Sequence, residues 1–113
     1  MLSIEDSWFA VIRSWAASKP DIAKAFVFGS RAKGIARPDS DLDIGIIVAS
    51  SNPNEDDYTC WFFNRDDWNR ELAEMIPITI DLQIANESIS TTVVAPAVKD
   101  HGVLIFDRSA IYT

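Results

Sequence analysis

The chain has 113 residues and a formal net charge of −7. This length indicates one domain over residues 1–113. A folded chain of this size buries roughly two-thirds of the surface that it exposes when unfolded. A protein that binds nucleic acid usually presents a basic surface to the phosphate backbone, whereas this chain has 17 acidic and ten basic side chains. Direct nucleic-acid binding is therefore not the expected activity. No apolar run is long enough to span a membrane and no basic signal region begins the chain, so we expect a cytoplasmic protein without a membrane partner. Cys60 is the one cysteine in the sequence, and we expect its side chain to be buried.

An amphipathic helix is expected first. Ser3 followed by Asp6 is typical of a helix start, and the apolar pattern ends at Lys19-Pro20. The residues that recur at helical spacing between them are Ile4, Trp8, Val11, Ile12 and Trp15. We interpret the stripe formed by Trp8 and Trp15 as core, with a platform for an aromatic substrate as the alternative.

A buried strand leading into a tight turn is expected next. The apolar run over residues 22–28 predicts the strand, and Gly29 with Ser30 predicts the turn. Ser30 is expected to be the N-cap of a short helical turn over residues 31–33, whose outward N–H groups would attract phosphate. Ten residues separate Ser30 from Asp41, enough for the chain to return into a second strand. We therefore expect the turn to lie close to the carboxylates of that strand.

Three acids are expected on strands. In residues 41–48 a period of two places Asp41 and Asp43 on one face of a second strand and the apolar residues on the other. Over a Cα separation of about 7 Å, two such carboxylates can converge on a pair of hard cations. Residues 77–84 alternate in the same way, with Asp81 opposite the apolar positions. On neighbouring strands, the three acids would form a cluster suited to Mg²⁺.

The middle of the chain predicts a loop and a helix. Residues 49–57 have loop composition. The aromatic run over residues 58–63 is interpreted as half-buried at the sheet edge, with an exposed contact patch as the alternative. A helix is expected to begin at Asn64 or Asp66 and to end at Pro77.

The last segments predict a helix and a closing edge strand. The helix is expected from Ser88 to His101, with Pro96 kinking it or delaying its start, and the strand over residues 103–106. His101, beside Gly102, is interpreted as a helix-end residue favoured by the helix dipole, with a general base as the alternative. The resulting order predicts an α/β (α+β) fold, a small mixed sheet with helices covering one face.

One signature resembles that of the DNA polymerase β-like nucleotidyltransferases: Gly29-Ser30, ten residues, Asp41-Leu42-Asp43 and a later Asp81. The likeness spans roughly residues 22–106, and the short chain is similar to the minimal (MNT) branch of that superfamily. The resemblance implies the nucleotidyltransferase fold. It also implies that Gly29 and Ser30 bind the triphosphate, that Asp41 and Asp43 bind two Mg²⁺ ions, and that Asp81 joins the catalytic metal site and helps to activate the acceptor hydroxyl.

Three basic residues lie near this signature. Arg31, Lys33 and Arg37 are interpreted as ordinary surface charge that balances nearby acids, with phosphate or partner contact as the alternative. Under that alternative, Arg31 together with Ser40 is a further candidate for nucleotide binding.

The resemblance to the MNT branch also implies a partner. It implies transfer of AMP from ATP to a hydroxyl, expected to be a tyrosine, of a HEPN-type helical toxin, with this chain as the antitoxin. An acidic surface would suit a basic RNase, and an acceptor from another protein is expected because no second acceptor-binding domain is apparent. The alternatives are a non-catalytic nucleotide-binding antitoxin that neutralises its partner by complex formation, and an aminoglycoside-type nucleotidyltransferase that modifies a small molecule.

Overall fold

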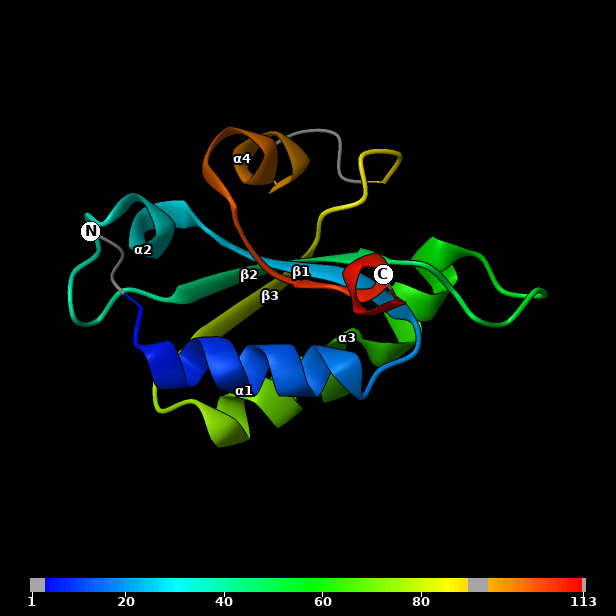
Figure 1. Cartoon of the computed structure of the whole chain (residues 1–113), viewed down its shortest axis with the longest axis horizontal. Helices are drawn as coiled ribbons and strands as arrows, with labels where there is room; N and C mark the ends of the chain where they lie inside the picture. Colours follow the sequence, from blue (N-terminus) through cyan, green and yellow to red (C-terminus); the bar gives the residue numbers. More distant parts are fainter. Residues whose placement is uncertain (1–3, 90–93, 113) are drawn as a thin grey trace.

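A four-stranded mixed sheet forms the centre of the molecule in the computed structural model, which describes residues 4–89 and 94–112 (Figure 1). The strands are β1 (Ile22–Phe28), β2 (Leu42–Val48), β3 (Ile80–Ile84) and β4 (Val103–Asp107), in the spatial order β3-β2-β1-β4. β1 runs antiparallel to β2 and β4, whereas β2 and β3 are parallel. The predicted α+β architecture and the predicted closing edge strand are therefore confirmed.

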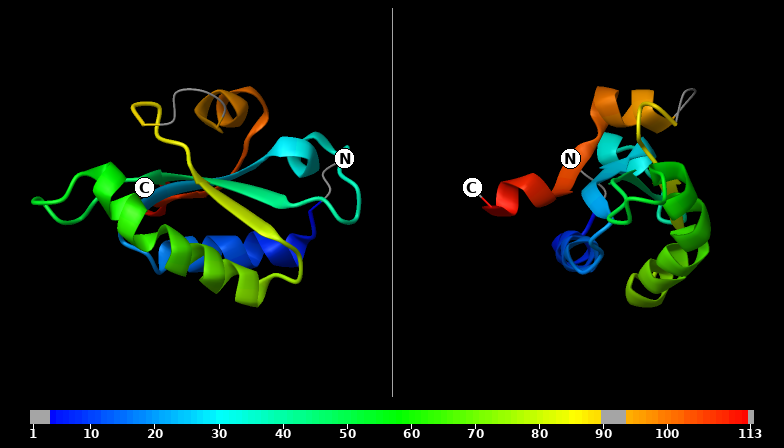
Figure 2. Two further views of the ribbon diagram at one scale, coloured as in Figure 1. Left: turned by 180° about the vertical axis from the view of Figure 1, so that it is seen from behind. Right: turned by 90° about the vertical axis from the view of Figure 1, so that its right-hand side faces the viewer.

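Helices lie on both faces of this sheet, so the prediction that they cover one face is wrong. α1 (Asp6–Ala17) and α3 (Asp57–Met75) lie on one face, and α2 (Gly29–Lys33) and α4 (Val94–His101) lie on the other (Figures 1 and 2). The strand order explains this arrangement. The parallel connection from β2 to β3 requires a crossover, which α3 provides. The connection from β3 to β4 must pass from one edge of the sheet to the other, and α4 occupies the face that α3 leaves open.

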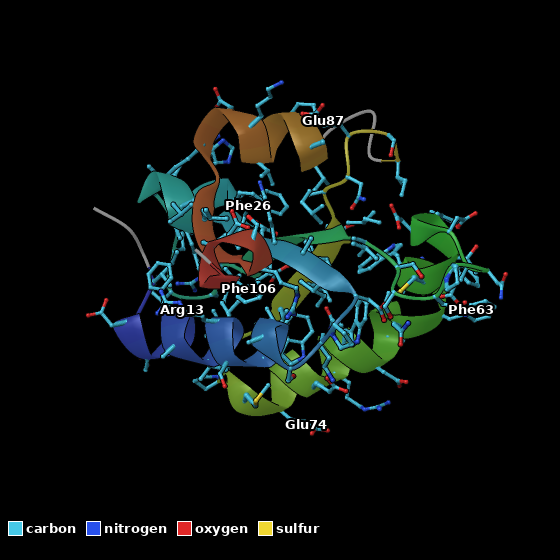
Figure 3. The ribbon with its side chains drawn as sticks, turned by 45° about the vertical axis from the view of Figure 1, so that its right-hand side comes forward. Arg13, Phe26, Phe63, Glu74, Glu87 and Phe106 are labelled. Carbon is cyan, nitrogen blue, oxygen red and sulfur yellow. The ribbon has the colours of Figure 1, made fainter. Side chains whose placement is uncertain are left out.

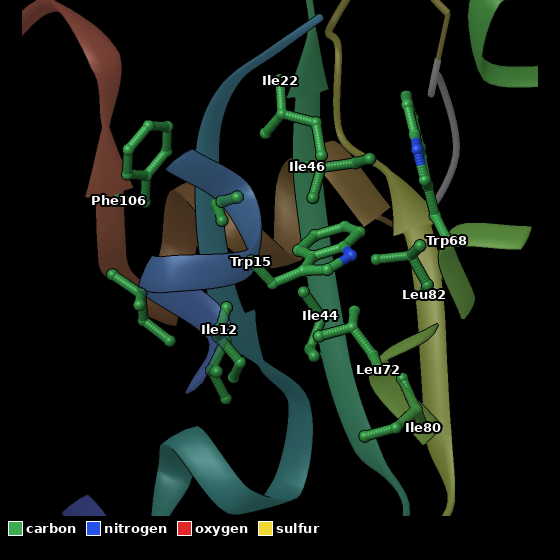
Figure 4. Packing of buried hydrophobic residues seen from close by; sticks show 14 of the residues in the cluster. Ile12, Trp15, Ile22, Ile44, Ile46, Trp68, Leu72, Ile80, Leu82 and Phe106 are labelled. Atoms are coloured by element: carbon green, nitrogen blue, oxygen red, sulfur yellow. The ribbon is translucent and has the colours of Figure 1, made fainter. Parts of the chain in front are cut away.

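The main core lies between the sheet and the pair α1 and α3. Figure 4 shows Ile44 and Ile46 of β2 packed with Trp15 of α1 and with Trp68 and Leu72 of α3. The rings of Trp15 and Trp68 meet edge to face with centroids 6.3 Å apart, an arrangement that aromatic pairs favour. The interpretation of the tryptophan stripe as core is confirmed, because Trp8 is buried as well.

α1 begins slightly later than its sequence pattern suggests. Its N-cap is Glu5, which makes no side-chain capping hydrogen bond. The predicted start at Ser3 lies outside the described residues.

α3 begins at Asp57, well before the predicted starts at Asn64 and Asp66, which are wrong. Its N-cap is Asp56, whose side chain accepts a hydrogen bond of 2.7 Å from the N–H of Thr59. A carboxylate at the N-cap stabilises a helix start by about 1 kcal/mol, and this favours a helix over a strand.

The aromatic run over residues 58–63 therefore forms the first turns of α3, and its predicted place at the sheet edge is wrong. Helical spacing directs Cys60 and Trp61 into the core, which confirms the prediction for the cysteine. The other aromatic side chains of the run, those of Tyr58, Phe62 and Phe63, are exposed. Phe63 lies at the outer edge of the molecule (Figure 3).

α4 ends at His101, as predicted, and is described from Val94 onward. Pro96 is its third residue, a position in the first turn where a missing N–H costs no helical hydrogen bond. Ser88, the predicted N-cap, lies in a turn after β3, and residues 90–93 are outside the described ranges. Of the helices in the described part of the chain, none has the length and apolar character needed to cross a membrane.

Candidate active site

Two of the three predicted acids are brought together on the face of the sheet opposite the main core. Asp43 of β2 and Asp81 of β3 are register partners across the parallel strand pair. On its other side Asp43 is the register partner of Phe28, the last residue of β1. Asp41 is exposed and precedes β2, which begins at Leu42, so its predicted place within the strand is wrong by one residue.

The environment of Asp43 disfavours its charged form. Burial raises the pKa of its carboxyl, and the charge of Asp81, a hydrogen bond with Asp81 and the charge of Asp41 raise it further, to about 6. Repulsion of this kind arises when carboxylates lie close together without a cation between them. The three acids therefore form one electrostatic group, with Asp43 at its centre.

Asp81 is oriented by a neighbour that the sequence pattern did not single out. The side-chain amide of Gln83 donates a hydrogen bond of 2.7 Å to Oδ1 of Asp81. The two residues are separated by two positions on β3 and therefore share a face of the strand. Alternation along the strand is enough to place Gln83 on the same face as Asp81. A glutamine in a strand, however, does not by itself indicate a functional site.

Gly29 brings the turn after β1 against Asp43. Its φ is +74°, a left-handed conformation that glycine adopts without the cost that a Cβ imposes. A Cβ at this position would also overlap Oδ2 of Asp43. The expectation that the turn and the carboxylates are neighbours is confirmed for this pair. The glycine is required both by its backbone conformation and by the close approach.

Ser30 is not the N-cap that the sequence predicted. α2 begins at Gly29, its N-cap is Phe28, and Ser30 is the second helical residue. The reason is that Gly29 already turns the chain, so the helix starts two residues earlier than a cap at Ser30 would require. α2 ends where Gly34, with a φ of +75°, terminates it.

Arg31 is buried, which contradicts its interpretation as surface charge. Its side chain is 6% exposed. Nε and Nη2 donate to the carbonyl of Ser40 at 3.1 and 2.8 Å, and Nη2 also donates to the carbonyl of Pro38 at 3.2 Å. The guanidinium lies 5.5 Å from the ring centroid of Trp8. Arg31 thus stabilises the loop that leads to Asp41.

Ser40 is part of the same loop. Its Oγ accepts a hydrogen bond of 2.9 Å from the N–H of Arg37. The side chains of Lys33 and Arg37 are exposed, as expected for surface charge. Nucleotide contact by Arg31 and Ser40 stays a prediction, and the contacts described here are with the protein itself.

His101 contacts the turn directly, which the sequence did not indicate. Its Nε2 accepts a hydrogen bond of 2.9 Å from the N–H of Gly29, and its Nδ1 lies 3.1 Å from Oδ2 of Asp100. His101 is the last residue of α4, as predicted. No local pattern could have revealed the contact, because 72 positions separate its two residues.

The donor chemistry of the acidic group fits a hard divalent cation. Carboxylate oxygens are the ligands that Mg²⁺ prefers, and a cation would relieve the repulsion that raises the pKa of Asp43. Within residues 4–89 and 94–112, no three side chains of His, Cys, Asp or Glu are arranged so that they could already enclose a metal ion. The strands bring Asp43 and Asp81 together, and the third ligand would come from Asp41.

Comparison with known proteins gives a consistent picture. The family model described as "Polymerase beta, Nucleotidyltransferase" matches residues 11–111. The fold is similar to a chain in a toxin–antitoxin crystal structure with AMP-PNP, at 18% identity and a TM-score of 0.65 over 95% of this chain and 77% of that one. It is also similar to a chain in the structure of a tri-AMPylated Shewanella oneidensis HEPN toxin in complex with an MNT antitoxin, at 17% identity and a TM-score of 0.64 over 96% and 77%.

A more distant similarity is to a solved structure from Sulfolobus solfataricus, at 19% identity and a TM-score of 0.52 over 89% of this chain and 78% of that one. No curated protein matches the chain. At these identities, the similarity to the solved structures is one of fold.

Proposed function

Because the chain belongs to the polymerase β nucleotidyltransferase family, we propose that it is a Mg²⁺-dependent adenylyltransferase that transfers AMP from ATP to a tyrosine hydroxyl of a HEPN-type toxin and thereby acts as an antitoxin. The observation that carries the proposal is the register pairing of Asp43 with Asp81 beside the glycine turn at Gly29. Two solved structures of similar fold support the donor and the acceptor, one described as a toxin–antitoxin with AMP-PNP and one containing a tri-AMPylated HEPN toxin.

The residues of the site have separate roles in this proposal. Gly29 and Ser30 bind the β- and γ-phosphates, since a residue without a side chain lets phosphate oxygens approach the backbone. Asp41, Asp43 and Asp81 would bind Mg²⁺. Bound Mg²⁺ supplies neutralisation of the triphosphate charge and favours ionisation of the acceptor hydroxyl.

The transfer itself is an in-line displacement. The acceptor oxygen forms a bond to the α-phosphorus while the bond from that phosphorus to the bridging oxygen of the β-phosphate breaks, and pyrophosphate leaves. Asp81 receives the proton of the acceptor hydroxyl, and Gln83, which donates to Oδ1 of Asp81, orients the carboxylate for this step.

Intact-mass measurement of the partner tests the proposal. The protein is incubated with its cognate helical partner, ATP and Mg²⁺, and each transferred AMP adds a fixed increment to the mass of the partner. We expect the increment to vanish with Asp41→Asn, a change at an exposed position that leaves the fold intact. Asp39→Asn, at an exposed acid in the same loop, is the matched control and should retain transfer. A partner that is neutralised with unchanged mass, equally by wild type and Asp41→Asn, would identify a binding antitoxin instead.

A further inference from the structure

The imidazole of His101 is held against the Gly29 turn by the backbone that follows it. Gly102 makes a tight bend between α4 and β4, in which its N–H donates to the carbonyl of Val98 at 2.8 Å. A Cβ on Gly102 would overlap the backbone oxygen of Val98. The side chain of His101 is 17% exposed, and Nε2 accepts the Gly29 N–H at 2.9 Å. The ring therefore has a defined position beside the site but remains accessible to solvent.

This contact determines the tautomer of the ring. An atom that accepts a hydrogen bond from a backbone N–H must present a lone pair, so Nε2 of His101 is unprotonated here. The ring hydrogen is then on Nδ1, which faces Oδ2 of Asp100 at 3.1 Å. A carboxylate in this position favours the Nδ1–H tautomer.

A phosphate oxygen at the Gly29 N–H would change the role of His101. The oxygen would compete with Nε2 for the same donor and would meet its lone pair, which is a repulsive contact between two acceptors. If the ring takes up one proton from solvent, Nε2 becomes a donor, and a hydrogen bond from an imidazolium to a phosphate is of the strong, charge-assisted kind.

The elements that pack against α4 carry two carboxylates besides that of Asp100, together with three cations. α4 packs against β1, α2, β2 and β3. The charged residues on these four elements are Lys24, Arg31, Lys33, Asp43 and Asp81.

We propose that His101 is a phosphate-binding residue of the nucleotide site: it accepts the Gly29 N–H when the site is empty, and it donates from Nε2 to a phosphate oxygen when a nucleoside triphosphate is bound. This inference rests on the proposed function, because it requires a triphosphate at Gly29. It differs from a purely structural role, in which His101 would connect α4 to the turn after β1 and would keep that contact whether or not nucleotide is present.

The first test compares nucleotide affinity among variants of the whole protein. The dissociation constant of ATP in the presence of Mg²⁺ is measured calorimetrically. His101→Ala should weaken binding about tenfold or more, the expected effect of losing a charge-assisted hydrogen bond. His101→Gln should restore most of the affinity, because its amide can accept from Gly29 and can donate to phosphate. Lys99→Ala is the matched control, since this exposed cation on the same helix pairs with Glu87, and we expect a change of no more than about twofold.

The second test observes the ring in the wild-type protein and does not depend on a variant that must fold. His101 is the one histidine in the sequence, so nitrogen-15 NMR of labelled imidazole reports on this residue without assignment. Without nucleotide, one ring nitrogen should be protonated and one unprotonated. With saturating Mg²⁺ and ATP, both should be protonated.

The inference requires both the loss of ATP affinity in His101→Ala and the protonation of both ring nitrogens in the wild-type protein with nucleotide. Equal ATP affinity in wild type and His101→Ala would overturn the inference and leave the proposed function standing. A loss of affinity with an unchanged ring would identify a structural role and would also overturn it. A wild-type protein that does not bind Mg²⁺ and ATP would overturn both the inference and the proposed function.

Discussion

Asp43 and Asp81 are register partners on the parallel strands β2 and β3, so two carboxylates lie side by side on a partly shielded face of the sheet. Neighbouring side chains across a strand pair lie about 5 Å apart, and like charges in such a pair are destabilising. Burial raises the pKa of Asp43, and this proximity raises it further, to about 6. The charge of Asp43 destabilises the fold, and the same charge would bind a cation. The stability of the protein, its pH dependence and metal binding therefore all depend on this residue.

Asp43→Asn should stabilise the metal-free protein at neutral pH. The pKa of Asp43 in the folded protein, about 6, lies above its ordinary value of 3.8, so the folded state binds a proton more tightly than the unfolded state does. Its contribution to stability therefore falls as pH rises from about 4 to 6 and reaches its full cost above that range. Removing the charge should raise the free energy of unfolding by on the order of 1 to 2 kcal/mol at about pH 7.5, after discounting for solvent screening.

Urea denaturation in a chelator, at about pH 4 and about pH 7.5, checks this prediction. The free energy of unfolding of Asp43→Asn should exceed that of wild type at the higher pH and should equal it at the lower pH. Asp39→Asn should show no such dependence on pH. An Asp43→Asn protein that is less stable than wild type at both pH values would show that the carboxylate makes a structural contact instead.

Gly29→Ala should destabilise the fold more than Gly34→Ala does. Both glycines have a positive φ, +74° and +75°, so both substitutions incur backbone strain on the order of 1 kcal/mol. At Gly29 the new Cβ would also overlap Oδ2 of Asp43, whereas Gly34 is exposed. The difference between the two variants in urea denaturation therefore measures the crowding against Asp43. Equal losses would mean that this close approach contributes nothing to the requirement for glycine.

Arg31→Ala should cost on the order of 2 to 4 kcal/mol of stability. It leaves the carbonyls of Pro38 and Ser40 without their guanidinium donor and removes the contact with the ring of Trp8. Lys33→Ala, at an exposed position of the same short helix, is the matched control and should stay within about 0.5 kcal/mol of wild type. Thermal or urea unfolding of the two variants gives the comparison, and a small effect at Arg31 would contradict its assignment to loop stabilisation.

Mg²⁺ and ATP together should raise the melting temperature more than either does alone, because the acidic group would hold the cation and the cation would supply positive charge for the phosphates. At about a hundredfold excess over the dissociation constant, the added stability should be about 2.7 kcal/mol. Ser30→Ala should reduce the shift, whereas Ser7→Ala, at an exposed serine of α1, should leave it unchanged. A melting curve that saturating Mg²⁺ and ATP do not move would exclude a nucleotide site at this turn.

The sequence by itself determined which residues lie on the side of each strand opposite the core, because the patterns that decide this are local. A period of two over residues 41–48 and 77–84 requires that Asp43 and Asp81 lie opposite the apolar core, and Gly29 is recognisable because a chain reversal needs its backbone freedom. The helical spacing of Trp8 and Trp15 likewise predicted their burial. Each of these properties depends on residues within a few positions of one another.

Only the tertiary structure decided which elements enclose the site and which distant groups enter it. The start of α3 depended on Asp56 as N-cap, and an aromatic run fits a strand as well as a helix, so the sequence pattern alone placed residues 58–63 wrongly. The strand order β3-β2-β1-β4 places α4 over the acidic face and His101 against Gly29. Arg31 is buried because the loop folds back onto it. Contacts of this kind join residues that are far apart in the chain or that meet only once a loop has folded, and no local periodicity encodes them.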